Sequence, residues 1–265
     1  MRKYRKPYRV KKKKSIFRNR FFWLGILIFI FFGGIFYLTC FHSFFQVKVI
    51  EISGNQKVPT ADLQNIIQNR IEKKVLFFRS KGIFLADLNK INGAILEKFP
   101  QIAQANLDKK FPNTLLAQVE ERKPIAIFCQ GERYFFLDKE GIIFEEVSEV
   151  GIEYLKIKNL TLIEDLKLGE EVVKKEVLPK ILEIESKLRE NFKISAEEIS
   201  ILSEDRLNAK TLDGWEIYFN PQKDLNWQLT KLNAVLEEEI PLERRKDLEY
   251  IELRFGNFAP YKYKD

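Results

Sequence analysis

The chain has 265 residues, with 45 Lys and Arg against 38 Asp and Glu, a formal net charge of +7. Residues 1–20 hold eleven of those bases and no acid, so the remaining residues carry more acids than bases. A nucleic-acid-binding domain spreads its basic charge over a folded face, so this confined charge argues against nucleic acid as a partner. One histidine and two cysteines exclude disulfide frameworks, most metal centres and histidine-based catalysis.

The first element in chain order is an apolar segment over residues 21–41, which contains no charge. A helix of this length spans about 30 Å, the thickness of the hydrocarbon core of a bilayer. Trp23 and Tyr37 near its ends suit the two membrane interfaces. A cleaved signal peptide has a shorter apolar region and ends in small residues, whereas this segment ends in the bulky sequence Tyr37-Leu38-Thr39-Cys40-Phe41. We therefore expect an uncleaved transmembrane anchor.

The charges that flank this segment predict its orientation. Eleven Lys and Arg residues precede it, whereas Lys48 is the only Lys or Arg among the eight residues that follow Phe41. The positive-inside rule then places residues 1–20 in the cytoplasm and residues 42–265 outside, as in a single-pass type II protein of the cell (inner) membrane. We expect the basic tail to contact anionic lipid headgroups of the bilayer.

Residues 45–122 have the pattern of a small α+β domain. Leu63, Ile66, Ile67 and Ile71 share one helix face, and two later segments alternate apolar and polar residues around a short turn. The expected elements are a strand over 47–52, a turn at Gly54-Asn55, a helix with Thr60 as N-cap, a loop containing Phe77-Phe78, a helix over 88–99, and strands over 103–107 and 115–119. Their order is β-α-α-β-β, which places helices on one sheet face.

Residues 123–256 predict a β-rich domain with two helices, followed by a tail over 257–265. Asp213-Gly214 between alternating apolar segments is a strong hairpin signal. Amphipathic spacing predicts helices over 175–192 and 224–239, and Tyr250–Gly256 reads as a closing strand. The predicted fold class is therefore α+β: an N-terminal transmembrane helix, a β-α-α-β-β domain and a β-rich domain with two helices.

Three strings carry a resemblance to a known family: VKVIEISGNQKV, FPQIAQANLDKKFPNTLLAQVEERKPIA and YFFLDKEGIIF. Their order and spacing resemble the bacterial cell-division family FtsQ/DivIB, whose first extracytoplasmic domain is a POTRA domain. The matching positions are Gly54, Asn55, Pro112, Leu115, Glu121, Arg122, Pro124, Asp138, Gly141 and Phe144.

The resemblance implies a non-enzymatic, membrane-anchored scaffold of the divisome at the division septum. Its expected partners are septal membrane proteins, chiefly an FtsB-like and FtsL-like coiled-coil pair. In the family, a closing strand "(I/V)-D-L-R-(Y/F)" at the sheet edge receives a segment of FtsB. By resemblance, the partner-binding residues here are Leu253, Arg254, Phe255 and Gly256, with Phe258 or Tyr261 beyond them. The sequence departs from the pattern in having Glu252 for Asp and Phe255 where Tyr is frequent.

An exposed strand edge offers unpaired backbone groups, so we expect a partner strand to add there. Arg254 would pair with a partner acid through its planar fork, and Phe255 would supply an apolar anchor. An ordinary closing strand with a surface arginine is the alternative for each of these residues.

Catalysis has little support in this sequence. His42 lies next to the membrane, away from Cys129, and no phosphate-binding glycine motif occurs. Paired carboxylates, as in a cell-wall hydrolase, stay open because 38 acids always include pairs. Glu121-Arg122-Lys123-Pro124 reads as charges that point to solvent at a strand end. We expect no catalytic residue, no cofactor, no metal and no small-molecule substrate. The alternative function is a POTRA-type chaperone or anchor in envelope protein secretion or assembly.

Overall fold

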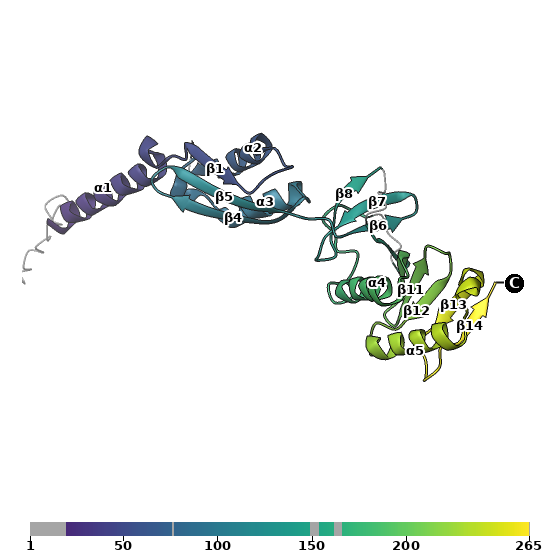
Figure 1. The fold of residues 1–265 in the computed structure, drawn as a ribbon. Coiled ribbons are helices and arrows are strands. Elements are labelled where there is room, and N and C mark those ends of the chain that lie inside the picture. Colours follow the sequence, from purple (N-terminus) through teal and green to yellow (C-terminus); the bar gives the residue numbers. More distant parts are fainter. Residues whose placement is uncertain (1–19, 76, 149–153, 162–165, 265) are drawn as a thin grey trace, which may run out of the picture. The chain divides into compact units, whose positions relative to one another are not determined.

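The computed structural model describes residues 20–75, 77–148, 154–161 and 166–264 (Figure 1). The chain divides into two compact units. The first comprises Met1–Ser53, Thr60–Gly93 and Asn106–Gln118, and the second comprises Gly54–Pro59, Ala94–Ala105 and Val119–Asp265.

Helix α1 (Arg20–Phe41) opens the described chain. It is long and apolar enough to cross a membrane, and its side chains are not packed into a protein core, except for Cys40 in its last turn, which is buried. The apolar helix predicted over 21–41 is thus confirmed and fits a single membrane anchor. Most of the basic tail, residues 1–19, lies outside the described residues.

After α1 the chain forms a small α+β fold around a three-stranded sheet of order β1-β5-β4, with β1 parallel to β5. Its elements are η2 (Ser43–Phe45), β1 (Val49–Ser53), α2 (Thr60–Ile71), β2 (Lys73–Val75), β3 (Phe78–Ser80), η3 (Ile83–Leu85), α3 (Leu88–Lys98), β4 (Ile102–Lys110) and β5 (Thr114–Glu121). Leu63, Ile67 and Ile71 of α2 are buried, as the helical spacing predicts.

One local prediction in this region is wrong in part. The loop expected to contain Phe77-Phe78 is the turn of a hairpin: Phe77 lies in this turn, whereas Phe78 begins β3, which pairs antiparallel with β2 so that Val75 faces Phe78. Strands of three residues are too short to produce a visible alternation in the sequence. Thr60, the expected N-cap, is the residue at which α2 begins.

Gly54 and Glu121 together close the turn after β1. Gly54 has φ +89°, and a Cβ there would lie 2.0 Å from the Val119 carbonyl oxygen, so only glycine fits. The Glu121 carboxylate accepts backbone N–H groups from Gln56, Lys57 and Val58 at 2.8–2.9 Å. Burial opposes ionisation of Glu121, but these donors outweigh it, and the pKa of Glu121 is lowered.

Arg122 forms an ion pair with Asp138, which follows β7 (Arg133–Leu137). The two side chains are only 10% and 3% exposed. Asp138 Oδ1 also accepts the backbone N–H groups of Glu140 and Ile142, at 2.9 and 3.0 Å. The expectation that residues 121 and 122 point to solvent is therefore wrong, because backbone N–H groups and a buried carboxylate surround them.

The rest of the chain builds a nine-stranded sheet of order β14-β13-β12-β11-β10-β9-β6-β7-β8. Its elements besides β7 are β6 (Ala126–Gln130), β8 (Ile143–Val147), β9 (Lys156–Asn159), α4 (Leu178–Phe192), β10 (Ala196–Ser203), β11 (Arg206–Thr211), β12 (Glu216–Phe219), α5 (Leu225–Glu238), η4 (Leu242–Asp247), β13 (Leu248–Glu252) and β14 (Tyr261–Tyr263). The predicted α+β fold class with a β-rich second part and two helices is confirmed.

One hydrophobic core joins this sheet to α4 and α5. It includes Ile181 and Leu188 of α4, Leu232 of α5, and Ile217 and Ile251 of the sheet. Because side chains alternate along a strand, Glu216 and Tyr218 of β12 and Tyr250 and Glu252 of β13 lie on the opposite face. That face carries polar and aromatic side chains.

Candidate partner-binding surface

The strand expected to close the sheet is not its edge. β13 ends at Glu252, and β14 pairs with it antiparallel, placing Leu248 opposite Tyr263 and Ile251 opposite Tyr261. The Glu252 N–H donates to the Pro260 carbonyl at 2.7 Å, which extends the contact. The chain's own C-terminal residues therefore cover β13, and the open edge belongs to β14. This corrects the expectation that Tyr250–Gly256 forms the exposed edge.

The five residues predicted to bind a partner have different surroundings. Leu253 is fully buried in the core, and its N–H donates to the Tyr218 carbonyl at 3.0 Å. Phe255 and Phe258 are exposed, at 57% and 79%. Gly256 is also exposed and has φ +53°, the left-handed conformation that turns the chain away from β13.

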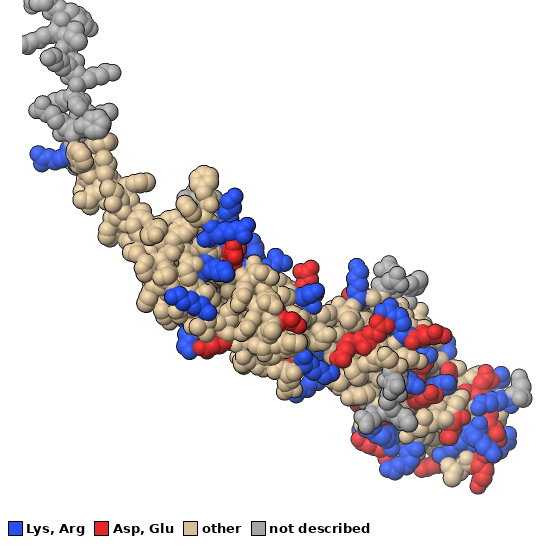
Figure 2. All heavy atoms as spheres, turned by 90° about the horizontal axis from the view of Figure 1, so that it is seen from above, with Lys and Arg blue, Asp and Glu red and all other residues tan. Residues whose placement is uncertain are grey.

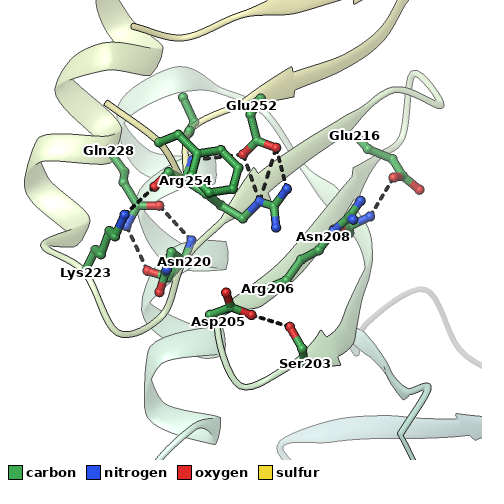
Figure 3. Close-up of polar contacts among 12 residues, drawn as sticks. Ser203, Asp205, Arg206, Asn208, Glu216, Asn220, Lys223, Gln228, Glu252 and Arg254 are labelled. Carbon is green, nitrogen blue, oxygen red and sulfur yellow. Dashed lines mark hydrogen bonds and ion pairs between the residues drawn. The ribbon is translucent and has the colours of Figure 1, made fainter. Parts of the chain in front are cut away.

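Arg254 pairs with Glu252 within the chain rather than pointing freely to solvent (Figure 3). Its Nε donates to Glu252 Oε1 at 2.9 Å and its terminal nitrogen to Oε2 at 2.7 Å, a fork geometry. The hydrogen bond to Glu252 raises the pKa of Arg254. The guanidinium also lies 4.7 Å from the Phe255 ring centroid. Arg254 therefore holds Phe255 in place through its planar face.

Two lysines, Lys223 just before α5 and Lys231 within it, donate hydrogen bonds to the backbone of residues 253–256. Lys231 Nζ is buried and donates to the carbonyls of Leu253 (2.6 Å), Phe255 (3.1 Å) and Gly256 (3.3 Å). Lys223 Nζ donates to the Arg254 carbonyl at 2.9 Å. Burial lowers the pKa of Lys231. Four successive carbonyls thus accept from lysines, which fixes the backbone of residues 253–256.

An aromatic and basic cluster adjoins Arg254 on the helix-free face of the sheet. The Tyr218 and Tyr250 rings stack with centroids 5.0 Å apart, and the Arg206 guanidinium lies 4.6 Å from the Tyr218 ring. Burial raises the pKa of Tyr218 to about 12. Tyr218, Tyr250 and Arg206 were not among the predicted site residues, although the alternation of Ile217 and Phe219 with Glu216 and Tyr218 along the strand places the latter two on one face.

A groove of about 520 Å³ runs beside α5 next to the same segment. Trp227 of α5, Phe258 and Tyr261 are among its lining residues. Trp227 is half exposed, so its ring and that of Phe258 offer apolar surface to a bound chain. Together with residues 253–258 and β14, this groove forms what we call the C-terminal surface.

Comparison with known proteins identifies the chain. A family model described as the POTRA domain of FtsQ type matches residues 45–122, and one described as the C-terminal domain of cell division protein FtsQ/DivIB matches residues 126–254. The chain belongs to the FtsQ/DivIB family. The resemblance drawn from the sequence motifs is therefore confirmed, as is the presence of a POTRA domain.

Individual relatives of this FtsQ/DivIB-family protein are cell-division proteins. The chain is 32% identical to DivIB of Clostridium acetobutylicum over 130 residues, 49% of this chain and about half (48%) of that protein. It is 22% identical to DivIB of Clostridium tetani over 232 residues, 82% of this chain and 80% of that protein. It is 29% identical to FtsQ of Geotalea daltonii over 183 residues, 68% and 61% of the two chains.

The described residues offer no group of three or more His, Cys, Asp or Glu side chains positioned to hold a metal ion. Cys129 is buried in β6, and burial raises its pKa to about 11, so it is a neutral thiol at pH 7. The C-terminal surface presents exposed aromatic side chains and the outer edge of β14.

Proposed function

We propose that this FtsQ/DivIB-family protein is a non-enzymatic scaffold of the bacterial divisome. Its α1 helix anchors it in the cell membrane with the basic tail in the cytoplasm and the remaining domains outside. There it binds other septal membrane proteins, chiefly an FtsB-like and FtsL-like coiled-coil pair, and so supports septum formation.

The observation that carries this proposal is the construction of the C-terminal surface. The backbone of residues 253–256 is held by Lys231 and Lys223, so Phe255 is presented from a fixed position. Fixed aromatic side chains lose little conformational entropy when they are buried by a partner, which makes them effective binding anchors.

Each residue then has a distinct role in binding. Phe255 and Phe258 insert into the partner as apolar anchors. Arg254 positions Phe255 through its contact with the ring, while buried Leu253 attaches the segment to the core. Gly256 supports the turn that separates the two aromatic rings. A strand of the partner adds to the outer edge of β14, which is the last strand of the sheet among the described residues.

The test is the affinity of the full-length protein, in lipid nanodiscs, for the FtsB-like and FtsL-like pair of its own organism. We expect Phe255→Ala to weaken binding about thirtyfold, because loss of a central anchor costs about 2 kcal/mol. Phe258→Ala should weaken binding in the same direction. Both side chains are exposed, so the fold should be unaffected.

Leu212→Ala is the matched control. Leu212 is 66% exposed at the turn between β11 and β12 in the same domain, and lies outside the C-terminal surface. Its replacement should leave the affinity unchanged. Tight binding with the same affinity in the wild type and in both phenylalanine variants would show that the partner uses another surface. Absence of binding by the wild type would contradict the assignment of this partner pair.

A further inference from the structure

The end of the membrane helix is joined directly to the β2–β3 hairpin of the first unit. The Cys40 carbonyl accepts hydrogen bonds from Gln46 Nε2, at 2.9 Å, and from the Ser80 hydroxyl. The ring of Phe41, the last residue of α1, contacts that of Phe78 edge-on with centroids 5.9 Å apart. The contacts of Ser80 and Phe78 therefore attach the hairpin to the last turn of α1.

This attachment determines the depth of the hairpin relative to a bilayer. The 22 residues of α1 span about 33 Å, so a helix that crosses a hydrocarbon core of about 30 Å emerges close to Phe41. Because Phe78 touches Phe41, the hairpin lies at the level of the lipid headgroups rather than in bulk water.

Six phenylalanines gather around this end of the first unit, and we call them the aromatic collar: Phe44, Phe45, Phe77, Phe78, Phe84 and Phe111. Phe45 and Phe84 have ring centroids 5.3 Å apart, and Phe84 and Phe111 are 5.1 Å apart. Phe77, in the turn of the hairpin, is 89% exposed, and Phe78 is 67% exposed. So much exposed aromatic surface is unfavourable in water and marks an interaction site.

Basic residues flank the tip of the collar. The hairpin segment 72–81 carries Lys73, Lys74, Arg79 and Lys81 against the single acid Glu72, which pairs with Arg79 at 3.2 Å while the Arg79 side chain stays 82% exposed. Lys74 and Arg79 face each other across the hairpin. Figure 2 shows the contrast between the uncharged tan surface of the helix and the blue patches, with fewer red ones, that appear where the folded part begins. An apolar tip between bases is the pattern of segments that enter an anionic membrane interface.

We infer that the aromatic collar is a second membrane contact: the β2–β3 hairpin inserts Phe77 and Phe78 into the leaflet from which α1 emerges, while Lys74 and Arg79 bind anionic headgroups. The contact holds the first unit against the membrane surface, so that α1 is not its only attachment to the bilayer. It requires only that α1 spans the bilayer, and it does not depend on which partner the C-terminal surface binds.

The experiment measures the depth of residue 77 in the full-length protein. Phe77→Cys, in a Cys40→Ala, Cys129→Ala background, is labelled with a nitroxide and placed in nanodiscs that contain phosphatidylglycerol. Oxygen concentrates in the bilayer and a charged nickel complex in water. We expect the ratio of collision rates with oxygen over nickel to be several-fold larger at residue 77 than at the control position.

Ala61→Cys is that control. Ala61 is exposed at the start of α2, about 15 Å along the helix from its end near the hairpin. Equal, water-like ratios at residues 61 and 77 would overturn the membrane contact. Replacing Lys74 and Arg79 by Glu should reduce the ratio at residue 77 in anionic nanodiscs, and an unchanged ratio would overturn the role of these bases.

Discussion

Arg122 and Arg133 illustrate how surroundings decide what an arginine contributes. Both form ion pairs, but Arg122 and its partner Asp138 are almost fully buried, whereas Arg133 and Glu146 are each about half exposed. In water the gain from pairing is largely offset by solvation, while a buried charge without its partner is strongly unfavourable. Arg122 is therefore a structural residue, and its position in the family motif reflects folding rather than partner binding.

We expect Arg122→Ala to lower the free energy of unfolding by about 3 kcal/mol, because it leaves the Asp138 carboxylate buried without a cation. Chemical denaturation of the full-length protein measures this loss. Arg133→Ala is the control and should cost less than about 1 kcal/mol, as exposed pairs do. Equal losses for the two variants would contradict a special role for the buried pair.

At the scale of elements, β14 changes which backbone groups the C-terminal sheet presents. It has three residues, yet Tyr261 and Tyr263 are half-buried against the core and Lys262 pairs with Glu249 at 2.5 Å. The Arg244 guanidinium also lies 4.1 Å from the Tyr263 ring. A short edge strand with a lysine limits uncontrolled pairing between molecules.

Removal of residues 261–265 should abolish partner binding and lower the free energy of unfolding by about 2 kcal/mol, since two partly buried tyrosines are lost. Binding in nanodiscs and thermal unfolding measure the two effects. A variant that lacks only Asp265 should behave as the wild type. Tighter binding after the truncation would mean that β14 occupies the place of the partner strand on β13, and that the partner pairs with β13 instead.

At the scale of the whole molecule, the described residues contain one helix that is long and apolar enough to cross a membrane; it belongs to the first compact unit, and the C-terminal surface lies in the second. A scaffold of this kind works only if these units and its partners are on the same side of the membrane. The eleven bases of residues 1–20 favour retention of the tail in the cytoplasm, because positively charged segments cross the membrane poorly.

Protease is added to cells whose envelope layers outside the cell membrane have been removed. It should digest residues 42–265 and leave a small fragment, protected by the membrane, that contains the N-terminus and α1. Antibodies against tags at both chain ends provide the measurement. Replacing most bases of the tail by Gln or Glu should reduce the fraction with this orientation. Protection of the C-terminal tag in the wild type would contradict the proposed orientation.

The apolar N-terminal helix, the α+β fold class and the family were predictable from the sequence, because each depends on local composition or on motifs of adjacent residues. The apolar length of residues 21–41 and the turn glycine at position 54 are examples. The helices of the second unit were also predictable, since their apolar residues recur at helical spacing.

The tertiary structure alone decided the details of the candidate site, because they depend on contacts between distant residues. Lys231 reaches carbonyls more than twenty positions away, and the Tyr218 stack joins two strands separated by a helix. Whether β13 is an edge depends on β14, whose three residues are too short to show a period in sequence. Local pattern indicates the longer strands, whereas the last pairing in the sheet determines which backbone edge and which aromatic rings are exposed.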